Sequence, residues 1–306
     1  MPLTDVQAVI VSRNPGLHLM RVVNILLSVL PTDNILIVDN NSQDECIKML
    51  PKQVRVKSLS CNIGFVAAAN IGLFDSYQMG RKFLLLVNQD VWFEPDALIR
   101  LRNIMEKDSQ IGAAFASVIK ADNPNISDGA IGKICKRSVL LTFTDEGRNP
   151  PQSGAPIAAD FGNGCFAMWS VQAVCGAGGF DPRLFAYHDE ADMSIKLKSR
   201  GYKILVVPSI RIMHKGHMPD SPGFLIKQYF IARNTMLLSG THFSGITAGR
   251  ILFFALIRLM MNYLYLNRNL SPKAIKMRIA GWSDGLMHRK IRNEIQNMLQ
   301  GVGEDI

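Results

Sequence analysis

Acidic side chains crowd one short stretch in the second half of the sequence. Three carboxylates and a histidine fall within five residues, namely His188, Asp189, Glu190 and Asp192. Acidic residues are common where a helix begins, because the helix dipole favours negative charge there, and Asp192 can pair with Lys196 one turn later. Carboxylates packed this closely also raise one another's pKa, which is how a general base is tuned. The stretch therefore has two interpretations, a solvated helix start and a catalytic acid–base site.

A second group of oxygen donors, Asn88-Gln89-Asp90, follows a predicted buried strand at 82–87. Carboxylate and amide oxygens suit Mg²⁺ or Mn²⁺, and such ions commonly take one or two carboxylates together with phosphate oxygens. His214, at the end of a later apolar segment, is a candidate additional ligand, although a lone histidine is more often simply hydrogen-bonded. The sequence thus offers a candidate cation site apart from the acidic stretch.

Alternating strands and helices must position these groups. Apolar runs predict buried strands at 8–12, 34–38 and 82–87, residues 54–58 alternate like a strand, and a further strand is predicted at 111–119. Helical patterns follow at 17–30, 66–79 and 95–107. Ser42 and Glu45 have the spacing of a capping box, which predicts one more helix start. This alternation favours an α/β fold of the Rossmann-like kind, with a mainly parallel sheet flanked by helices.

Polar clusters follow four of the predicted strands, at residues 13–14, 39–41, 62–64 and 88–90. Ligands bind beyond the carboxyl ends of such strands, so we expect the clusters to converge there. Turns also favour Asn, Asp and Gly, which explains one cluster more easily than all four. An acid at the end of the second strand, here Asp39, commonly contacts the ribose or base of a nucleotide. The glycine fingerprint of NAD enzymes and the P-loop of NTPases are both missing from the sequence, which disfavours those classes.

The remainder of the chain is predicted to contain long loops and a few strands, followed by helices from residue 224 onward. Residues 120–158 predict long loops with one hairpin, followed by strands at 160–169, 202–207 (ended by Pro208) and 210–214, and a helix that ends near Arg200. Helical patterns then occupy residues 224–238, 247–266 and 271–300. The 247–266 segment is strongly apolar but contains Arg250 and Arg258, a composition that suits either a membrane interface or a core helix.

Charge is distributed unevenly between the two parts of the sequence. Residues up to Ile195 carry 17 basic and 20 acidic side chains, whereas those from Lys196 onward carry 17 basic and 5 acidic ones. Such asymmetry indicates an anionic partner, either a membrane or a nucleic acid. The tail lacks the interleaved aromatics of nucleic-acid modules, so we expect no nucleic acid. Five cysteines without metal spacing, no recognisable signal peptide and no apolar run of about 20 residues predict a cytoplasmic protein without a membrane span.

The polar motifs together resemble the inverting family 2 glycosyltransferases of GT-A fold. The resemblance is carried, in order, by the motifs at residues 37–42, 62–65, 70–72, 88–91, 179–181, 185–192, 201–202, 207–208 and 214. The resemblance spans about residues 5–235. Within the family, the sequence resembles the bacterial rhamnosyltransferases that build O-antigen and related polysaccharides.

The resemblance implies a role for each motif. The donor, a nucleotide-diphosphate sugar for which dTDP-rhamnose is favoured, would be bound by Arg13, Asn14, Asp39, Asn41, Asn62, Gly64, Asn70, Asn88 and Gln89. Asp90 and His214 would hold Mg²⁺ or Mn²⁺, although an Asn stands where the family's first metal-motif acid is common. Glu190 would be the catalytic base, with Asp189 as its tuning neighbour and Asp192 as support. Asn163 and Gly164 would contact the acceptor, and a polyprenyl-linked or oligosaccharide acceptor is expected.

We therefore predict an enzyme that transfers a sugar to a growing, lipid-linked polysaccharide. Residues 1–238 would form the GT-A domain, with a nucleotide-sugar half at 1–95 and an acceptor half at 96–238, and residues 239–306 a basic helical extension. The extension would dock peripherally on an anionic membrane, or else join two copies of the chain. The alternative function is a nucleotide-sugar-binding regulatory protein on the same fold that has lost turnover.

Overall fold

The computed structural model describes residues 3–136, 138–150, 154–216, 218–243, 248–265 and 270–301. By its internal contacts the chain divides into two compact units. Unit 1 comprises Met1–Gly132, Phe143–Phe185 and Asp189–Gly216, and unit 2 comprises Lys133–Thr142, Ala186–His188 and His217–Ile306.

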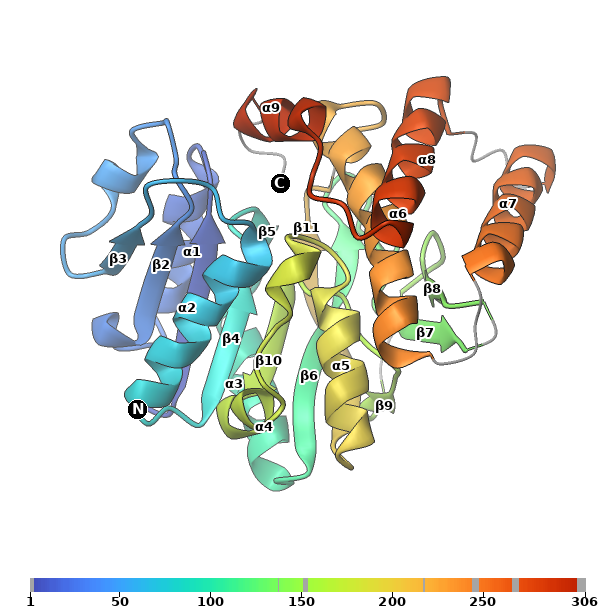
Figure 1. Ribbon diagram of the computed structural model, residues 1–306. Helices are drawn as coiled ribbons and strands as arrows, with labels where there is room; N and C mark the ends of the chain where they lie inside the picture. Colours follow the sequence, from blue (N-terminus) through green and yellow to red (C-terminus); the bar gives the residue numbers. More distant parts are fainter. Residues whose placement is uncertain are drawn as a thin grey trace. The chain divides into compact units, whose positions relative to one another are not determined.

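Unit 1 is built on one sheet, to which nine strands of the described chain belong (Figure 1). The strands run in the order β3-β2-β1-β4-β10-β6-β11-β5, and β9 pairs with β11. Their bounds are β1 Val6–Ser12, β2 Ile35–Asp39, β3 Arg55–Ser58, β4 Phe83–Val87, β5 Val91–Trp92, β6 Ile111–Lys120, β9 Ile157–Ala158, β10 Phe166–Ser170 and β11 Lys203–His214. The helices are α1 His18–Leu27, α2 Phe65–Gln78, α3 Pro95–Lys107, α4 Val171–Gly176 and α5 Asp189–Ser199.

The sheet is mixed, which refines the prediction of a mainly parallel one. The first four strands in the order are mutually parallel, as are β6 and β11. Between these two groups lies β10, which is antiparallel to both β4 and β6. The α/β class and the flanking helices are confirmed. The direction of β10 is set by its pairing with β4 and β6, which lie far away in the sequence.

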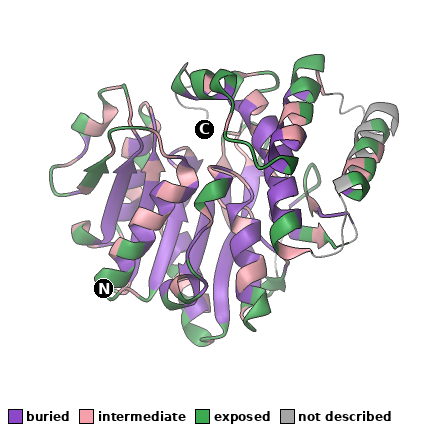
Figure 2. Ribbon diagram, in the orientation of Figure 1, coloured by how far each residue is buried: buried purple, intermediate pink, exposed green. Residues whose placement is uncertain are grey.

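Alternation along β1 explains how both faces of the sheet are covered. Val6, Ala8 and Ile10 share one core cluster with Leu19 of α1 and Leu98 of α3. Gln7 and Val9 point to the other face, where Gln7 Nε2 donates to Asp75 of α2 and Val9 packs against Gly72. A Cβ at Gly72 would lie 2.3 Å from Val9 Cγ1, so α2 can approach β1 this closely only because the residue is a glycine. The central strands are accordingly buried almost throughout (Figure 2).

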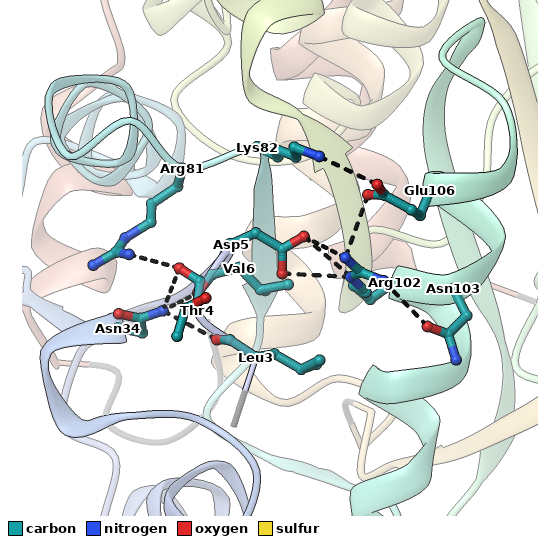
Figure 3. A network of polar contacts seen from close by, with 10 residues as sticks. All are labelled: Leu3, Thr4, Asp5, Val6, Asn34, Arg81, Lys82, Arg102, Asn103 and Glu106. Carbon is teal, nitrogen blue, oxygen red and sulfur yellow. Dashed lines mark hydrogen bonds and ion pairs between the residues drawn. The ribbon is translucent and has the colours of Figure 1, made fainter. Parts of the chain in front are cut away.

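A polar network ties down the amino end of β1 (Figure 3). Asn34 Nδ2 donates to the carbonyls of Leu3, Thr4 and Val6, at 3.2, 3.2 and 2.7 Å. Arg102 of α3 pairs with Asp5 at 2.8 Å and with Glu106 at 3.4 Å. These contacts fix the end of the strand opposite to the one where the predicted site residues lie.

Unit 2 is mainly helical and contains α6 Pro222–His242, α7 Ala248–Tyr265, α8 Pro272–Leu286 and α9 Asn293–Gly301. Two glycines let α8 pack directly on the backbone of α6, since a Cβ at Gly281 would lie 2.2 Å from the Tyr229 carbonyl oxygen and one at Gly285 2.3 Å from that of Arg233. A small core joins Val139, Ala232, Met236, Ile251 and Trp282. Within the described residues, none of the helices combines the length and the apolar character that crossing a bilayer requires.

Several predicted elements have other limits in the structure. Strand β11 continues through Pro208, which was predicted to end it, because a register shift between Val207 and Arg211 accommodates the proline. The capping box is wrong, since Ser42 Oγ accepts a hydrogen bond from Asn14 and only a short 3₁₀ turn, Cys46–Met49, follows. Helix α6, predicted in the first domain, groups with the C-terminal helices. The predicted hairpin is present as β7 Gly132–Cys135 and β8 Leu140–Phe143, and the expected helix ends Thr247 and Leu266 lie outside the described residues.

Candidate active site

The carboxyl ends of β1 and β4 are joined through Gln89. Its Oε1 accepts from Ser12 Oγ at 2.9 Å and from the Arg13 amide at 3.0 Å, and its Nε2 donates to the Arg13 carbonyl at 3.1 Å. Gln89 is buried, whereas Asn88 and Asp90 on either side of it are partly exposed. In the structure Gln89 therefore fixes the strand ends and presents its two neighbours.

Arg13, Asn14, Asp39 and Asn41 come together at the ends of β1 and β2, as the parallel register of Ser12 with Asp39 requires. Arg13 Nη1 donates to the carbonyls of Asn40 and Asn41, each at 3.2 Å. Burial lowers the pKa of Arg13, and the nearby charge of Asp39 opposes that effect. Asn14 and Asn41 both have positive φ, as short polar side chains in tight turns allow.

An amide bridge extends this group to the next predicted cluster. Asn40 Nδ2 donates to Asn62 Oδ1 at 2.9 Å, and Asn40 Oδ1 accepts from the Ile63 amide at 2.9 Å. Asn62 Oδ1 also accepts from the Gly64 amide at 2.9 Å. The three clusters at 13–14, 39–41 and 62–64 are thus in hydrogen-bonded contact, so the predicted convergence is observed for them.

Gly64 and Asn70, both predicted to bind the donor, contact the segment before the acidic stretch. A Cβ at Gly64, which has φ +87°, would lie 2.6 Å from the Phe185 ring. Asn70 Oδ1 accepts from the Phe180 amide at 2.9 Å, and Asn70 Nδ2 donates to the Phe180 carbonyl at 2.8 Å. The first half of α2 therefore packs against residues 180–185, and both the oxygen and the nitrogen of the Asn70 side-chain amide are hydrogen-bonded to Phe180.

Asp90 and His214 meet because β5 pairs with β11 in antiparallel register, His214 opposite Val91. His214 Nε2 lies 3.4 Å from Asp90 Oδ2, and its Nδ1 lies 3.1 Å from Asp128 Oδ2. Burial lowers the pKa of His214, but the charges and hydrogen bonds of Asp90 and Asp128 outweigh this and raise the pKa to about 10. The two residues predicted as metal ligands are thus adjacent, with a second carboxylate behind the imidazole.

The acidic stretch forms the first turn of α5. Asp192 is buried and pairs with Lys196 at 2.6 Å, which confirms the structural role expected of that pair. Asp189 is buried as well, and burial together with the charge of Asp192 raises the pKa of Asp189 to about 7. Asp189 and Asp192 are thus turned inward, and Glu190 is the more exposed member of the three.

Cys165 is buried close to both acidic groups. Burial raises the pKa of its thiol, and the charges of Asp90, Asp128 and Glu190 raise it further. A Cβ at the neighbouring Gly164 would lie 3.6 Å from Glu190 Cβ and 3.8 Å from Glu190 Oε2. Asn163, the other residue predicted to contact the acceptor, donates from Nδ2 to the Gly129 carbonyl at 3.0 Å. The short segment 163–165 therefore links Glu190 with the Asp90 side of the site.

Sequence reasoning missed Asp128 and did not assign a role to Asn40. Asp128 lies in an aperiodic loop with many turn residues, so nothing in the local pattern singles it out. Asn40 follows a predicted strand, and its position among the polar clusters was a usable signal.

The sheet with its flanking helices has a fold of GT-A type. Two solved structures share the fold. GalNAc-T7 with UDP, GalNAc and Mn²⁺ has a TM-score of 0.56 and 21% identity, covering 76% of this chain and 50% of that one. The mannosyltransferase PcManGT from Pyrobaculum calidifontis, in complex with GDP-Man and Mn²⁺, has a TM-score of 0.56 and 11% identity, covering 94% and 88%. The chain thus spans half the length of the first of these structures.

Sequence comparison gives the particular family. Residues 8–159 match Glycosyl transferase family 2. The N-acetylglucosaminyl-diphospho-decaprenol L-rhamnosyltransferase of Mycobacterium tuberculosis is 24% identical over 248 residues, which cover 72% of this chain and 79% of that protein. The chain belongs to the family 2 glycosyltransferases and is rhamnosyltransferase-like.

Proposed function

We propose that the protein is an inverting glycosyltransferase that moves rhamnose from dTDP-rhamnose to a hydroxyl of a lipid-linked polysaccharide acceptor. The observation that carries this proposal is the segment Gly164–Cys165, which lies beside Glu190 at Gly164 and accepts a hydrogen bond from the Asn88 amide at the Cys165 carbonyl, at 2.9 Å, two residues before Asp90. Inversion needs a base and a diphosphate-binding group on opposite sides of the sugar, and the placement of Glu190 and Asp90 on separate segments supports such an arrangement. The relative named as a rhamnosyltransferase acting on a decaprenol-linked sugar supports the choice of donor and acceptor.

In this proposal Glu190 is the catalytic base. Its carboxylate takes the proton of the acceptor hydroxyl while that oxygen attacks the anomeric carbon from the face opposite the diphosphate. The bond to the diphosphate oxygen breaks, the new glycosidic bond forms with inverted configuration, and the nucleoside diphosphate leaves. Gly164 beside Glu190 leaves room for the acceptor, because it places no side chain there.

The nucleoside would be bound at the ends of β1 and β2. Asp39 Oδ1 accepts from the Ser42 amide at 2.9 Å, which holds the carboxylate at the strand end where an acid contacts a ribose or base. Arg13 and Asn14, which contact Asn41 and Ser42, and Asn62, which accepts from Asn40, belong to the neighbouring hydrogen-bonded loops and would complete this donor site. Asn88 lies beside Gln89, at the neighbouring strand end.

A divalent cation fits the residues present. Within the described part of the chain, no group of three or more His, Cys, Asp or Glu side chains is arranged to hold a metal ion by itself. The carboxylate of Asp90 and the imidazole of His214, 3.4 Å apart, are nevertheless suitable oxygen and nitrogen donors for Mn²⁺ or Mg²⁺. Such ions often complete their coordination with phosphate oxygens and water. When bound, the ion would neutralise charge on the departing diphosphate.

A panel of nucleotide sugars tests the donor. We expect dTDP-rhamnose to raise the melting temperature of the protein more than UDP-, GDP- or other dTDP-sugars do, and the increase to be larger with Mn²⁺ than with EDTA. A larger stabilisation by a UDP- or GDP-sugar than by dTDP-rhamnose would contradict the proposed donor.

The same proposal places the protein at an anionic membrane through unit 2. Ile275, Ile279 and Leu286 recur at helical spacing on one exposed face of α8, with Lys273 and Lys276 exposed on the same helix. Helix α7 likewise exposes Phe253, Leu256 and Met260. Apolar side chains beside lysines are the composition of helices that lie in the membrane interface.

Vesicle flotation tests this association. We expect the full-length protein to float with vesicles containing phosphatidylglycerol and not with phosphatidylcholine alone, and Ile279→Glu to reduce flotation severalfold. Met49→Glu, which changes an equally exposed residue of unit 1, is the matched control. Equal flotation of wild type and Ile279→Glu would overturn the assignment. If Ile279→Glu instead abolished a dimer seen by light scattering, the face would join two copies of the chain.

A further inference from the structure

The loop that follows β6 directs a carboxylate at the imidazole of His214. The Asp128 amide donates to the Val118 carbonyl at 2.9 Å, which attaches the loop to the end of β6. The Asp128 side chain then reaches His214 Nδ1 at 3.1 Å, while His214 Nε2 faces Asp90. Nδ1 of His214 thus contacts Asp128, and Nε2 faces Asp90, the other predicted metal ligand.

A buried carboxylate further along the loop keeps Asp128 in place. Asp145 accepts hydrogen bonds from Ser127 Oγ at 2.6 Å, from the Ala130 amide at 3.1 Å and from the Ile131 amide at 2.9 Å. These donors flank Asp128 on both sides in the sequence. Asp145 is only 6% exposed, so the loop is organised around an interior anchor and its conformation is tied to the body of unit 1.

This geometry matters for a histidine that binds a metal. A neutral imidazole coordinates through one nitrogen, and the hydrogen bond made by the other nitrogen selects which one is available. When a cation displaces the proton of Nε2, a carboxylate on Nδ1 keeps the remaining proton there and leaves the lone pair on Nε2, and it also fixes the orientation of the ring. In this chain the arrangement presents Nε2 to the side of Asp90.

We propose that Asp128 is a positioning residue that orients His214 for divalent-cation binding and that Asp145 holds the Asp128 loop. This inference rests on the metal site of the proposed function and extends it to residues outside the metal-binding pair. Asp128 acts through His214 and does not itself contact the ion.

Mn²⁺ binding to the full-length protein, measured by electron paramagnetic resonance with and without dTDP, tests the inference. We expect Asp128→Ala to weaken Mn²⁺ binding about 10- to 100-fold. Asp128→Asn keeps an oxygen that can accept from Nδ1 but loses the negative charge, so it should recover part, but not all, of the affinity. Binding of dTDP in EDTA should stay within about twofold of wild type in both variants, which a general loss of structure would not allow. Asp122→Asn, an exposed acid in the same loop, is the matched control and should bind Mn²⁺ as wild type does.

The possible results separate this inference from the function on which it rests. If wild type binds Mn²⁺, His214→Ala weakens the binding and Asp128→Ala matches wild type, the positioning role is overturned and the metal site stands. If wild type binds no Mn²⁺ with or without dTDP, the metal site of the proposed function fails and this inference fails with it. Should Asp128→Ala not fold, Asp128→Asn is the variant that tests the role. If Asp128→Asn then bound Mn²⁺ as tightly as Asp122→Asn does, and Asp145→Asn bound it as tightly as wild type, the positioning role would be overturned.

Discussion

Replacing Asp189 by Asn should remove a pH dependence from the stability of the protein. Asp189 is 7% exposed, and burial together with the charge of Asp192 raises its pKa from 3.8 to about 7. The folded protein therefore binds this proton more tightly than the unfolded chain does. Each pH unit of that difference corresponds to about 1.4 kcal/mol, so the total effect is about 4 kcal/mol.

The sign of the effect follows from linkage. The stabilisation from the bound proton is fully present below pH 3.8, and it is lost as the pH rises through about 7. Between pH 5 and pH 8 the free energy of unfolding of wild type should fall by roughly 2 to 3 kcal/mol relative to Asp189→Asn, whose side chain stays neutral. At pH 8 the variant should be the more stable protein.

Urea unfolding of both proteins at pH 5, 6, 7 and 8 measures this difference. Asp96→Asn serves as the control, because Asp96 also lies in the first turn of a helix but is exposed. Its unfolding free energy should follow that of wild type at every pH. A difference between wild type and Asp189→Asn that stayed constant within about 0.5 kcal/mol from pH 5 to pH 8 would refute the reasoning, because it would mean that Asp189 does not take up its proton in that range.

Two further predictions concern unit 2. Gly281→Ala should destabilise the protein by about 1 to 3 kcal/mol, because the new methyl group would lie 2.2 Å from the Tyr229 carbonyl oxygen. Gly240→Ala in α6 is the control, since its methyl group meets no atom within 4 Å, and it should be neutral or stabilising by up to about 1 kcal/mol. Thermal melting compares the two variants. Burial favours a raised pKa for Asp284, but hydrogen bonds from Arg292 at 2.7 and 2.9 Å and from Tyr229 at 2.9 Å lower it, so its contribution to stability should be present above pH 3.8 and lost in acid. Asp284→Asn should accordingly be less stable than wild type at pH 7 and should approach it as the pH falls towards 3, and equal slopes for both proteins would count against this ion pair.

Elements whose limits are set by residues within the segment itself could be predicted from the sequence, and elements whose course is set by distant strands could not. Helix α3 was predicted with its observed limits, Pro95–Lys107, because a proline at its first turn and an amphipathic pattern are both written in the segment itself. The direction of β10 was not predictable, since it is set by pairing with β4 and β6, which lie far away in the sequence. The prediction that Pro208 ends a strand was wrong for the same reason, because the register shift that accommodates the proline involves the neighbouring strand.

The candidate site shows the same division. The position of Asp39 and Asp90 at one edge of the sheet could be predicted because each stands at the end of an apolar run, and the carboxyl ends of parallel strands meet at one edge. Gln89 was predicted among the donor-binding residues, and its three hydrogen bonds across the strand ends could not be read from its position. Asp128 could not be found at all, because its significance comes from contact with His214, 86 residues later in the chain.

The most direct test of the central claim is the rate of sugar transfer by Glu190→Gln. With dTDP-rhamnose and a lipid-linked acceptor fraction, we expect the variant to transfer rhamnose about 10² to 10⁴ times more slowly than wild type, since an amide cannot take the proton of the acceptor hydroxyl. Its affinity for dTDP should remain within about twofold of wild type, and Glu146→Gln, which changes an exposed glutamate, should transfer at the wild-type rate. If Glu190→Gln transferred rhamnose as fast as Glu146→Gln does, Glu190 would not be the base.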